Sequence, residues 1–224
     1  MTMDDTRHRL INAAGYLFAE KGFESASIRE ICQRAEANIA AVNYHFGDKQ
    51  KLYIEAVKQA QCARVEEVPA LDLPPGVPPT ERLRLFVRLM LERMLHQERP
   101  AWHLELMLRE LARPTAACRE VVDAYIRPMA DQLRSIVVEL VPNYPPERLN
   151  LIGFSIVGQV LFYYVNRPII RLLIGDEAHQ ALTIEQLATH IARFSLAALG
   201  MAPPVQDQSA DDQSTDFQSK GGQP

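Results

Sequence analysis

The chain has 224 residues, of which 47% are apolar, and its net charge is −4. This length and composition allow a buried core in one large or two small domains. Its three cysteines, Cys32, Cys62 and Cys118, are odd in number and lack paired spacing, which excludes a disulfide scaffold and favours a reducing cytoplasm.

The hydropathy pattern of the sequence predicts neither a signal peptide nor a membrane-spanning helix. The N-terminus lacks the apolar segment of a signal peptide. The longest apolar run, Leu151 to Val165, has 15 residues and is too short to cross a bilayer. We therefore expect a cytoplasmic protein with no membrane partner. Because no alternating strand pattern occurs, we also expect an all-α fold.

The first predicted helix spans about residues 6–21. Its apolar stripe repeats with helical spacing, and Gly22 follows where a C-terminal capping glycine belongs. The stripe consists of Leu10, Ala13, Ala14, Leu17 and Phe18.

Residues 27–46 predict two short helices joined by a turn. Ser27 and Glu30 have the spacing of a capping box. In the turn, Asn38 is suited either to left-handed geometry or to capping the next helix. In that helix we expect Ile39, Val42 and Phe46 to point inward, and Ala40, Asn43 and Tyr44 to point outward. A short helix with such an outer face suits a DNA major groove.

A helix over 49–67 follows, and then a proline-rich connection. Five of the eleven residues from Pro69 to Pro79 are proline, which favours an extended, stiff segment. We divide the chain into a helix-turn-helix DNA-binding domain (1–67), a proline-rich linker (68–80), a helical effector-binding and dimerisation domain (81–202) and a disordered tail (203–224).

The second domain predicts a helical bundle. Helices are expected at about 81–97, 101–112, 114–140, 147–165 and 183–199, with a kink at Pro128 and a short apolar segment from Pro168 to Ile174. In the helix over 101–112 we expect the inward residues to be Leu104, Met107, Leu108 and Leu111. The last two long helices are apolar on more than one face, which favours a homodimer formed through them.

The charge is divided unequally along the chain. Residues 1–64 hold 9 basic and 8 acidic residues, and the remainder holds 15 and 20. This weakly positive first part lacks the strong basic character of many nucleic-acid-binding domains, so DNA binding depends on how the charges are distributed over its faces.

The second domain carries no pattern typical of catalysis, a cofactor or a metal site. Its histidines are scattered, and His103 and Glu105 fall on different faces of one helix, which is a poor metal geometry. Several large side chains are candidates for an effector pocket between helices, with core or dimer interface as the alternative. They are Trp102, His103, Met107, Phe154, Phe162 and Tyr163.

Three motifs carry a family resemblance. They are Phe18-x-x-Lys21-Gly22-Phe23, Ser27-Ile28-Arg29-Glu30-Ile31 and Ala41-Val42-Asn43-Tyr44-His45-Phe46-Gly47-Asp48-Lys49. Over about residues 6–55 the chain resembles the DNA-binding domain of TetR-family transcriptional regulators, and the run from Asn38 to Gly47 is similar to the CecR-like branch.

The resemblance implies a homodimer that binds a pseudo-palindromic double-stranded operator and releases it when a small molecule binds the C-terminal domain. It implies DNA contacts by Ser27, Ala40, Asn43, Tyr44, His45 and Lys49. Residue chemistry adds Arg29 as a phosphate contact and Ala41 as a site of close approach to the groove. The alternatives are a simple helix cap for Ser27, packing on the neighbouring helix for His45 and a solvated side chain for Lys49.

Asn43 departs from the commoner pattern of the family, in which an aromatic residue often stands first before Tyr-His-Phe. We expect this departure to shift position 43 from backbone contact towards base reading. Two other functions stay open: an activator or ligand-independent regulator, and a helical-bundle enzyme or carrier with a vestigial DNA-binding part.

Overall fold

The computed structural model describes residues 3–62, 76–95 and 100–202, and every regular element within these ranges is a helix. The predicted linker residues 68–75 and the tail 203–224 lie outside the described residues. The helices, with the one π-helical segment labelled η1, are α1 (Met3–Ser25), α2 (Ile28–Arg34), α3 (Ile39–His45), α4 (Lys49–Cys62), α5 (Pro79–Leu95), α6 (Ala101–Ala112), α7 (Ala116–Val121), η1 (Val122–Ile126), α8 (Arg127–Leu140), α9 (Pro146–Val165), α10 (Arg167–Ile174), α11 (Asp176–Ala181) and α12 (Ile184–Ala198).

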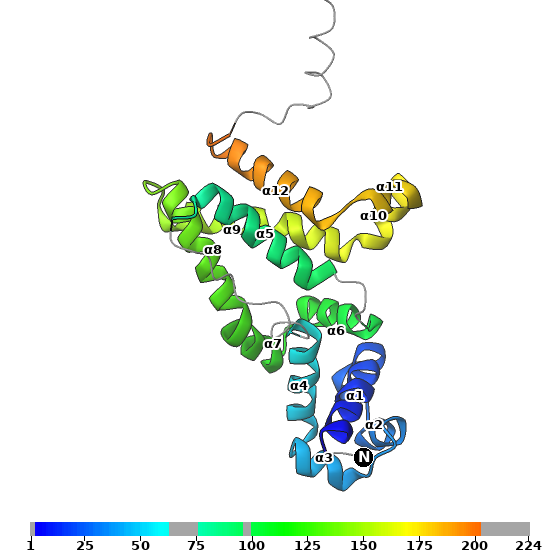
Figure 1. The fold of residues 1–224 in the computed structure, drawn as a ribbon. Helices are drawn as coiled ribbons and strands as arrows, with labels where there is room; N and C mark the ends of the chain where they lie inside the picture. Colours follow the sequence, from blue (N-terminus) through cyan, green and yellow to red (C-terminus); the bar gives the residue numbers. More distant parts are fainter. Residues whose placement is uncertain (1–2, 63–75, 96–99, 203–224) are drawn as a thin grey trace, which may run out of the picture.

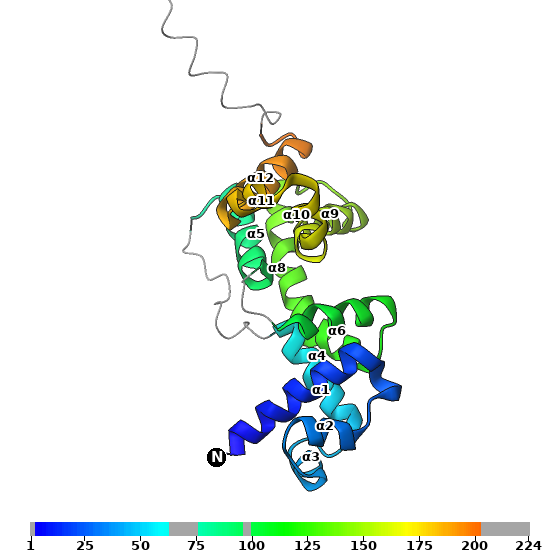
Figure 2. The same cartoon turned by 90° about the vertical axis from the view of Figure 1, so that its right-hand side faces the viewer.

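The molecule has two hydrophobic cores, one toward each end. Helices α1 to α4 lie at one end, and α9 to α12 at the other (Figure 1). The view turned by 90° shows the same separation (Figure 2). This arrangement places the predicted helix-turn-helix far from the predicted dimerisation helices.

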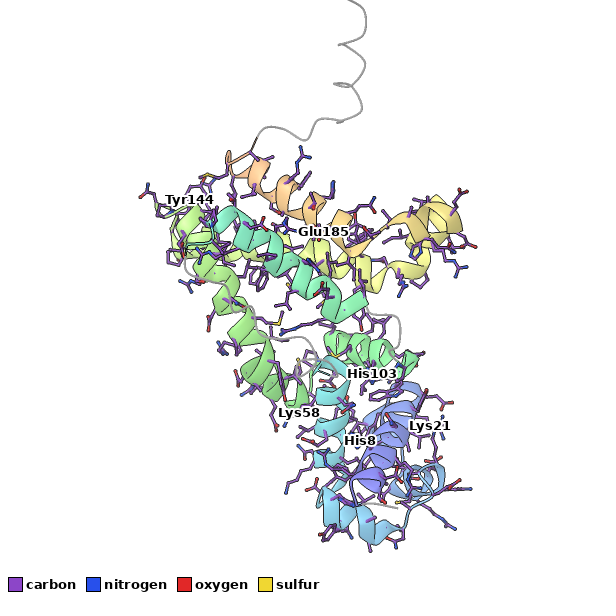
Figure 3. The ribbon with its side chains drawn as sticks, viewed as in Figure 1. His8, Lys21, Lys58, His103, Tyr144 and Glu185 are labelled. Atoms are coloured by element: carbon purple, nitrogen blue, oxygen red, sulfur yellow. The ribbon has the colours of Figure 1, made fainter. Side chains whose placement is uncertain are left out.

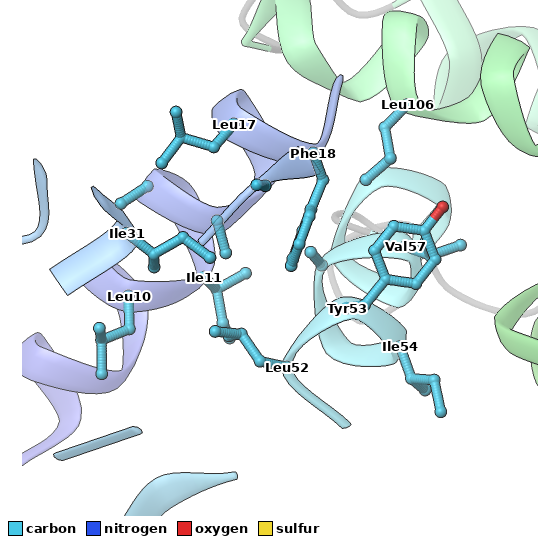
Figure 4. Packing of buried hydrophobic residues seen from close by; sticks show 14 of the residues in the cluster. Leu10, Ile11, Leu17, Phe18, Ile31, Leu52, Tyr53, Ile54, Val57 and Leu106 are labelled. Carbon is cyan, nitrogen blue, oxygen red and sulfur yellow. The ribbon is translucent and has the colours of Figure 1, made fainter. Parts of the chain in front are cut away.

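The first core forms between α1 and α4, and α2 and α3 pack onto α1. Figure 4 shows Leu10, Phe18, Ile31, Leu52 and Tyr53 meeting in this core. The predicted apolar stripe of the first helix is confirmed, because all five of its residues are buried. Gly22 has φ +80°, so the chain turns at the predicted glycine before the helical segment ends at Ser25.

Helix α6 completes this first core from beyond the proline-rich segment. It packs against α1 and α4, and its Trp102 and Leu106 are fully buried among their residues. A Cβ placed on Gly15 would lie 2.4 Å from Cε3 of Trp102. The lack of a side chain at position 15 therefore allows α1 and α6 to approach.

The predicted inward face of α6 is wrong at Leu108 and Leu111, while Met107 packs against the first core as predicted. Leu108 and Leu111 are 39% and 61% exposed, and the buried residues are Trp102, His103, Leu106 and Glu110. Glu110 is tolerated inside because the Tyr53 hydroxyl donates to its Oε1, and the N–H of Thr115 donates to its Oε2 at 3.2 Å. A buried carboxylate with such partners escapes most of the cost of lost hydration.

The second core joins α5, α8, α9 and α12. Phe86, Val87 and Leu91 of α5 face Ile136 and Val137 of α8, and all five are buried. At the surface, Arg84 of α5 pairs with Glu81 at 2.6 Å and also contacts Glu185 of α12. Figure 3 shows Glu185 beside this core and His103 beside the first.

The two cores are linked by one continuous helical path. Helix α7 runs into the π-helical segment η1, which runs into α8. Pro128 lies in the first turn of α8, directly after η1. A proline lacks an N–H and disturbs the α-helical ladder, and a π-helical turn absorbs this. The predicted disturbance at Pro128 is confirmed in this form.

Helix α9 is longer than the apolar run from which it was predicted. It spans 20 residues and is the one described helix long and apolar enough, by length and composition, to cross a membrane. Only 17% of its apolar window is buried. Leu151, Phe154 and Phe162 are 64%, 71% and 52% exposed. The helix therefore carries a large uncovered apolar face.

Candidate nucleic-acid interface

The N-terminus of α2 is fixed by the predicted capping box. The Ser27 hydroxyl accepts from the N–H of Glu30 at 3.2 Å, and the Glu30 carboxylate accepts from the N–H of Ser27 at 3.0 Å. Lys21 Nζ donates to Glu30 at 2.7 Å. The Lys21 hydrogen bond, aided by those from Ser27, lowers the pKa of Glu30 to about 2. The carboxylate stays charged and keeps the start of α2 ordered.

The turn between α2 and α3 uses Glu36 and Asn38 in different ways. Glu36 has φ +50°, the left-handed region that a residue with a Cβ rarely adopts. Asn38 is extended, and its Oδ1 accepts from the N–H of Ala41 at 2.8 Å. Of the two roles expected for Asn38, the structure shows the helix cap.

Helix α3 has one buried side and one exposed side. Val42 is buried, and Phe46, its C-terminal cap, is also buried. Ala40 and Asn43 are exposed, and Tyr44 is 71% exposed. The predicted outer face is therefore present. The inward placement of Ile39 is wrong, because it is 53% exposed at the first turn, ahead of the residues that reach the core.

Two further residues of α3 are half-buried. Ala41 packs against the first core. The ring of His45 stands edge-on to Tyr44, with centroids 5.0 Å apart, and lies 6.0 Å from the ring of Phe46. His45 thus occupies the border between the outer face and the core.

Three predicted residues lie beside α3. Ser27 and Arg29 are exposed at the start of α2. Lys49, at the start of α4, places Nζ 4.6 Å from the centre of the Phe23 ring and donates to the carbonyl of Glu24 at 3.3 Å. All eight predicted residues therefore belong to α2, α3 and the first turn of α4, at one end of the molecule (Figure 1).

One cation near α3 was missed from the sequence. Lys51 is exposed, and its Nζ lies 3.6 Å from the position of a Cβ on Gly47, the residue that follows the cap of α3. Within the described ranges it makes no ion pair. Its sequence position, two residues after Lys49 and close to Gly47, could have suggested Lys51 as a further candidate for a phosphate contact.

The six predicted pocket residues are not brought together. Trp102 and His103 are buried on α6, and Met107 packs against the same first core. Phe154 and Phe162 are exposed on α9, while Tyr163 packs against the second core. The six residues are therefore divided between the two cores and the exposed surface of α9. The contact at Gly15 accounts for Trp102, whose ring lies within the first core.

No described residues form a group of three His, Cys, Asp or Glu side chains placed to hold a metal ion. Cys32 and Cys118 are free thiols. Burial raises the pKa of both.

Comparisons with known proteins match both halves of the chain. Residues 10–56 match the family described as bacterial regulatory proteins of the tetR family, and residues 79–199 match the C-terminal domain of the transcriptional dual regulator CecR. The CecR regulator of Shigella flexneri is 26% identical over 203 residues, which cover 84% of this chain and 90% of that protein.

Solved structures show the same fold. The hemolysin II regulator HlyIIR aligns with a TM-score of 0.57 and 22% identity, covering 84% of this chain and 98% of its own. FadR of Bacillus subtilis, solved in complex with stearoyl-CoA, aligns with a TM-score of 0.58 and 14% identity, covering 85% of this chain and 97% of its own.

A helix-turn-helix carried on a second helical core, together with these relatives, identifies a DNA-binding transcriptional regulator. The chain belongs to the TetR family of transcriptional regulators, in the group with a CecR-type C-terminal domain.

Proposed function

We propose that this regulator is a repressor that binds a pseudo-palindromic operator as a homodimer and is released by a small hydrophobic molecule in the cytoplasm. The observation that carries this proposal is the divided α3, whose Val42 side is buried while Ala40, Asn43 and Tyr44 face outward. A short helix held rigidly from behind, with small and hydrogen-bonding side chains in front, fits the major groove.

The eight predicted contact residues divide into two roles. Asn43 reads a base, because an amide can pair with N6 and N7 of adenine, and Ala40 and Ala41 allow the helix to approach thymine methyl groups. Tyr44, His45, Lys49, Ser27 and Arg29 contact phosphates and set the register of the helix. Lys49 leaves the carbonyl of Glu24 to do so.

Dimerisation explains the uncovered apolar face of α9. Phe154 and Phe162 of α9 and Phe194 of α12 are 71%, 52% and 53% exposed. An isologous four-helix contact of α9 and α12 with a second copy buries all three rings. Exposed aromatic groups of this size are typical of protein interfaces.

Sedimentation velocity tests this interface. The full chain should sediment as a dimer at micromolar concentration, and Phe154→Glu should shift it to a monomer, because the interface then buries a charge. Val138→Glu is the matched control, since Val138 is also exposed, at 38%, but belongs to α8 and not to the helices of the proposed interface. A monomeric wild-type chain refutes the dimer.

The DNA-binding end is coupled to the C-terminal part through α6. Besides the Tyr53–Glu110 contact, Arg109 of α6 donates to the carbonyls of Ala19 and Glu20 at 3.0 and 3.2 Å. A movement of α6 therefore acts on α1 and α4 together. A ligand that favours one position of α6 changes the spacing of the two reading helices and so the affinity for one operator.

Operator selection from random duplexes, followed by a release screen of small hydrophobic compounds, tests the proposal. It predicts that the selection recovers a palindrome and that at least one compound releases the protein from that DNA. If a palindrome is recovered but no compound releases the protein, a ligand-independent regulator is favoured. If the selection enriches no sequence, both forms of the proposal are contradicted.

A second candidate is a regulator that also activates, as the word "dual" in the name of the CecR relative suggests.

A further inference from the structure

A cavity of about 700 Å³ lies in the C-terminal part, and of the six residues first expected to bind an effector its lining includes Tyr163. Its walls come from five elements: the last residue of α5, the end of α9, α10, α11 and the start of α12. The size falls within the range of roughly 300–1,000 Å³ typical of small-molecule sites. The lining residues are Leu95, Tyr163, Arg167, Ile170, His179, Gln180, Leu182, Thr183, Ile184 and Leu187.

Half of this lining is apolar. Ile170 and Leu187 are buried, and Leu95 and Ile184 are half-buried. Together with Leu182 they form an aliphatic surface contributed by α5, α10 and α12. A surface of this kind accommodates a hydrocarbon body, because each buried methylene contributes about 0.8 kcal/mol in transfer from water.

The polar half of the lining contains one permanent cation and no acid. Arg167 lines the cavity, and the ten lining residues include neither Asp nor Glu. Other arginines of this region are paired: Arg84 with Glu81 at 2.6 Å, and Arg171 with Asp176. Arg167, by contrast, makes no ion pair or side-chain hydrogen bond within residues 3–62, 76–95 and 100–202.

Two neutral donors accompany the cation. The hydroxyl of Tyr163, one turn before Arg167 in the chain, has no hydrogen-bond partner within the described part of the molecule, and neither does the side-chain amide of Gln180. Both side chains line the cavity. A guanidinium that shares a cavity with hydroxyl and amide donors offers a carboxylate both charge and hydrogen bonds.

We propose that this cavity binds an amphipathic organic anion, with its acid group on Arg167 and Tyr163 and its hydrocarbon body on Ile170 and Leu187. The proposal rests on the ligand-responsive function proposed above and specifies the class of ligand. The site adjoins α5, and α5 packs on α8. Helix α8 is continuous with η1 and α7, and α7 packs on α4 of the DNA-binding end. A shift of α5 on ligand binding can therefore be transmitted to α4 through packed helices.

Calorimetric titration of the full chain with decanoate, and with the uncharged alcohol of the same length, tests the proposal. Decanoate should bind saturably, and decanol should bind about tenfold or more weakly, because it cannot pair with the guanidinium. Arg167→Gln should weaken decanoate binding by about the same factor, and Arg167→Lys should weaken it less.

Two further variants locate the site. Gln180→Trp, at an exposed position of α11 that lines the cavity, reduces the free volume and removes the amide donor without changing the charge, and it should also weaken decanoate binding. Arg134→Gln is the matched control, since Arg134 is exposed on α8 and does not line the cavity. It should bind decanoate as the wild type does.

Absence of saturable decanoate binding overturns the proposal, as does equal binding of decanol or an unchanged affinity in Arg167→Gln. Binding of the selected operator is measured on the same samples without ligand. If operator binding is intact and decanoate does not bind, this proposal alone fails. If no operator is found, the failure lies with the proposed function.

Discussion

Asn43 stands on the exposed face of α3, and its side chain makes no hydrogen bond within the described ranges. Its amide is thus available to a partner without breaking a contact of the protein. We predict that Asn43→Ala lowers affinity for the selected operator by about 1–3 kcal/mol and removes discrimination at one base pair, because a bidentate amide contact is lost.

The measurement is fluorescence anisotropy on a panel of single-base operator variants. Tyr44→Phe is the companion variant, since a lost phosphate contact weakens every duplex by a similar factor. If Asn43→Ala also weakens every duplex equally, Asn43 is a backbone contact and the base-reading role is wrong.

Tyr53 holds a buried carboxylate across two helices. Burial, followed by the hydrogen bond to Glu110, raises the pKa of its phenol, so the hydroxyl remains a donor over the physiological range. Tyr53→Phe leaves Glu110 with Thr115 as its described hydrogen-bond partner. We predict a loss of about 1–3 kcal/mol in the free energy of unfolding, the cost of an under-satisfied buried group.

Urea denaturation measures this loss. Tyr16→Phe is the control, because Tyr16 is 39% exposed and its hydroxyl makes no hydrogen bond in the described part of the chain. Its ring contacts with Arg34 and Trp102 survive the change. Equal losses in the two variants would show that the Glu110 contact contributes nothing.

At the scale of elements, the packing of α1 on α6 depends on the missing side chain of Gly15. The atoms that a Cβ would meet belong to the rigid ring of Trp102, at 2.4–2.6 Å. We predict that Gly15→Ala displaces α6 and destabilises the protein by about 1–3 kcal/mol, as overpacking does. Trp102 is the single tryptophan, so its emission should shift to the red as the ring gains water.

Gly153→Ala on α9 is the control for this change. A Cβ there would meet Cδ2 of Leu133 at 3.8 Å, an ordinary contact. Alanine in a helix interior is favoured over glycine, so this variant should be neutral or slightly more stable. An unaltered Trp102 spectrum in Gly15→Ala would contradict the close approach of α1 and α6.

The cap of α2 has a predictable pH dependence. The pKa of Glu30 is lowered from 4.5 to about 2, so its contribution is present above the ordinary pKa and is lost as pH falls through the lowered one. Glu30→Gln keeps an acceptor for the capping box but loses the charge that attracts Lys21. The stability difference between wild type and variant should therefore shrink as pH falls from about 5 towards 2.

Chemical denaturation at a series of pH values measures that difference. A difference that stays constant over this range would show that the Lys21–Glu30 pair does not act through charge.

Local patterns in the sequence predicted the helices well and their partners poorly. The capping box at Ser27, the glycine turn at Gly22 and the proline at Pro128 act within a few residues, so the structure reproduces them. The inner face of α6 depends instead on Gly15 and Tyr53, which lie far away in the chain. The spacing of apolar residues does not indicate that Glu110 is buried, because its hydrogen-bond donors, Tyr53 and Thr115, are not part of that pattern.

The same distinction holds in the candidate DNA interface. The division of α3 into two faces follows from helical spacing and was predictable, apart from Ile39. The engagement of Lys49 with Phe23 and Glu24 was not, because it joins segments 25 residues apart. The exposed rings Phe154 and Phe162 of α9 were pocket candidates with core or dimer interface as the alternative, and apolar spacing alone does not separate these roles.

At the scale of the whole molecule, the reading helix and the uncovered apolar helices lie at opposite ends (Figures 1 and 2). Residues 1–64 carry a charge of only +1, so each DNA-binding end attracts DNA weakly. In the proposed dimer, pairing two copies at α9 and α12 would place two such ends on one duplex and raise the effective concentration of the second. The proposal thereby gives the apolar end a direct role in DNA binding.

The central claim is that α2, α3 and the first turn of α4 form the surface that meets DNA. Hydrogen–deuterium exchange of the full chain, with and without its selected operator, tests this most directly. We predict slower exchange over residues 27–51 on operator binding, with a scrambled duplex giving little change. Unchanged exchange over residues 27–51, with protection appearing elsewhere on the chain, would contradict the account.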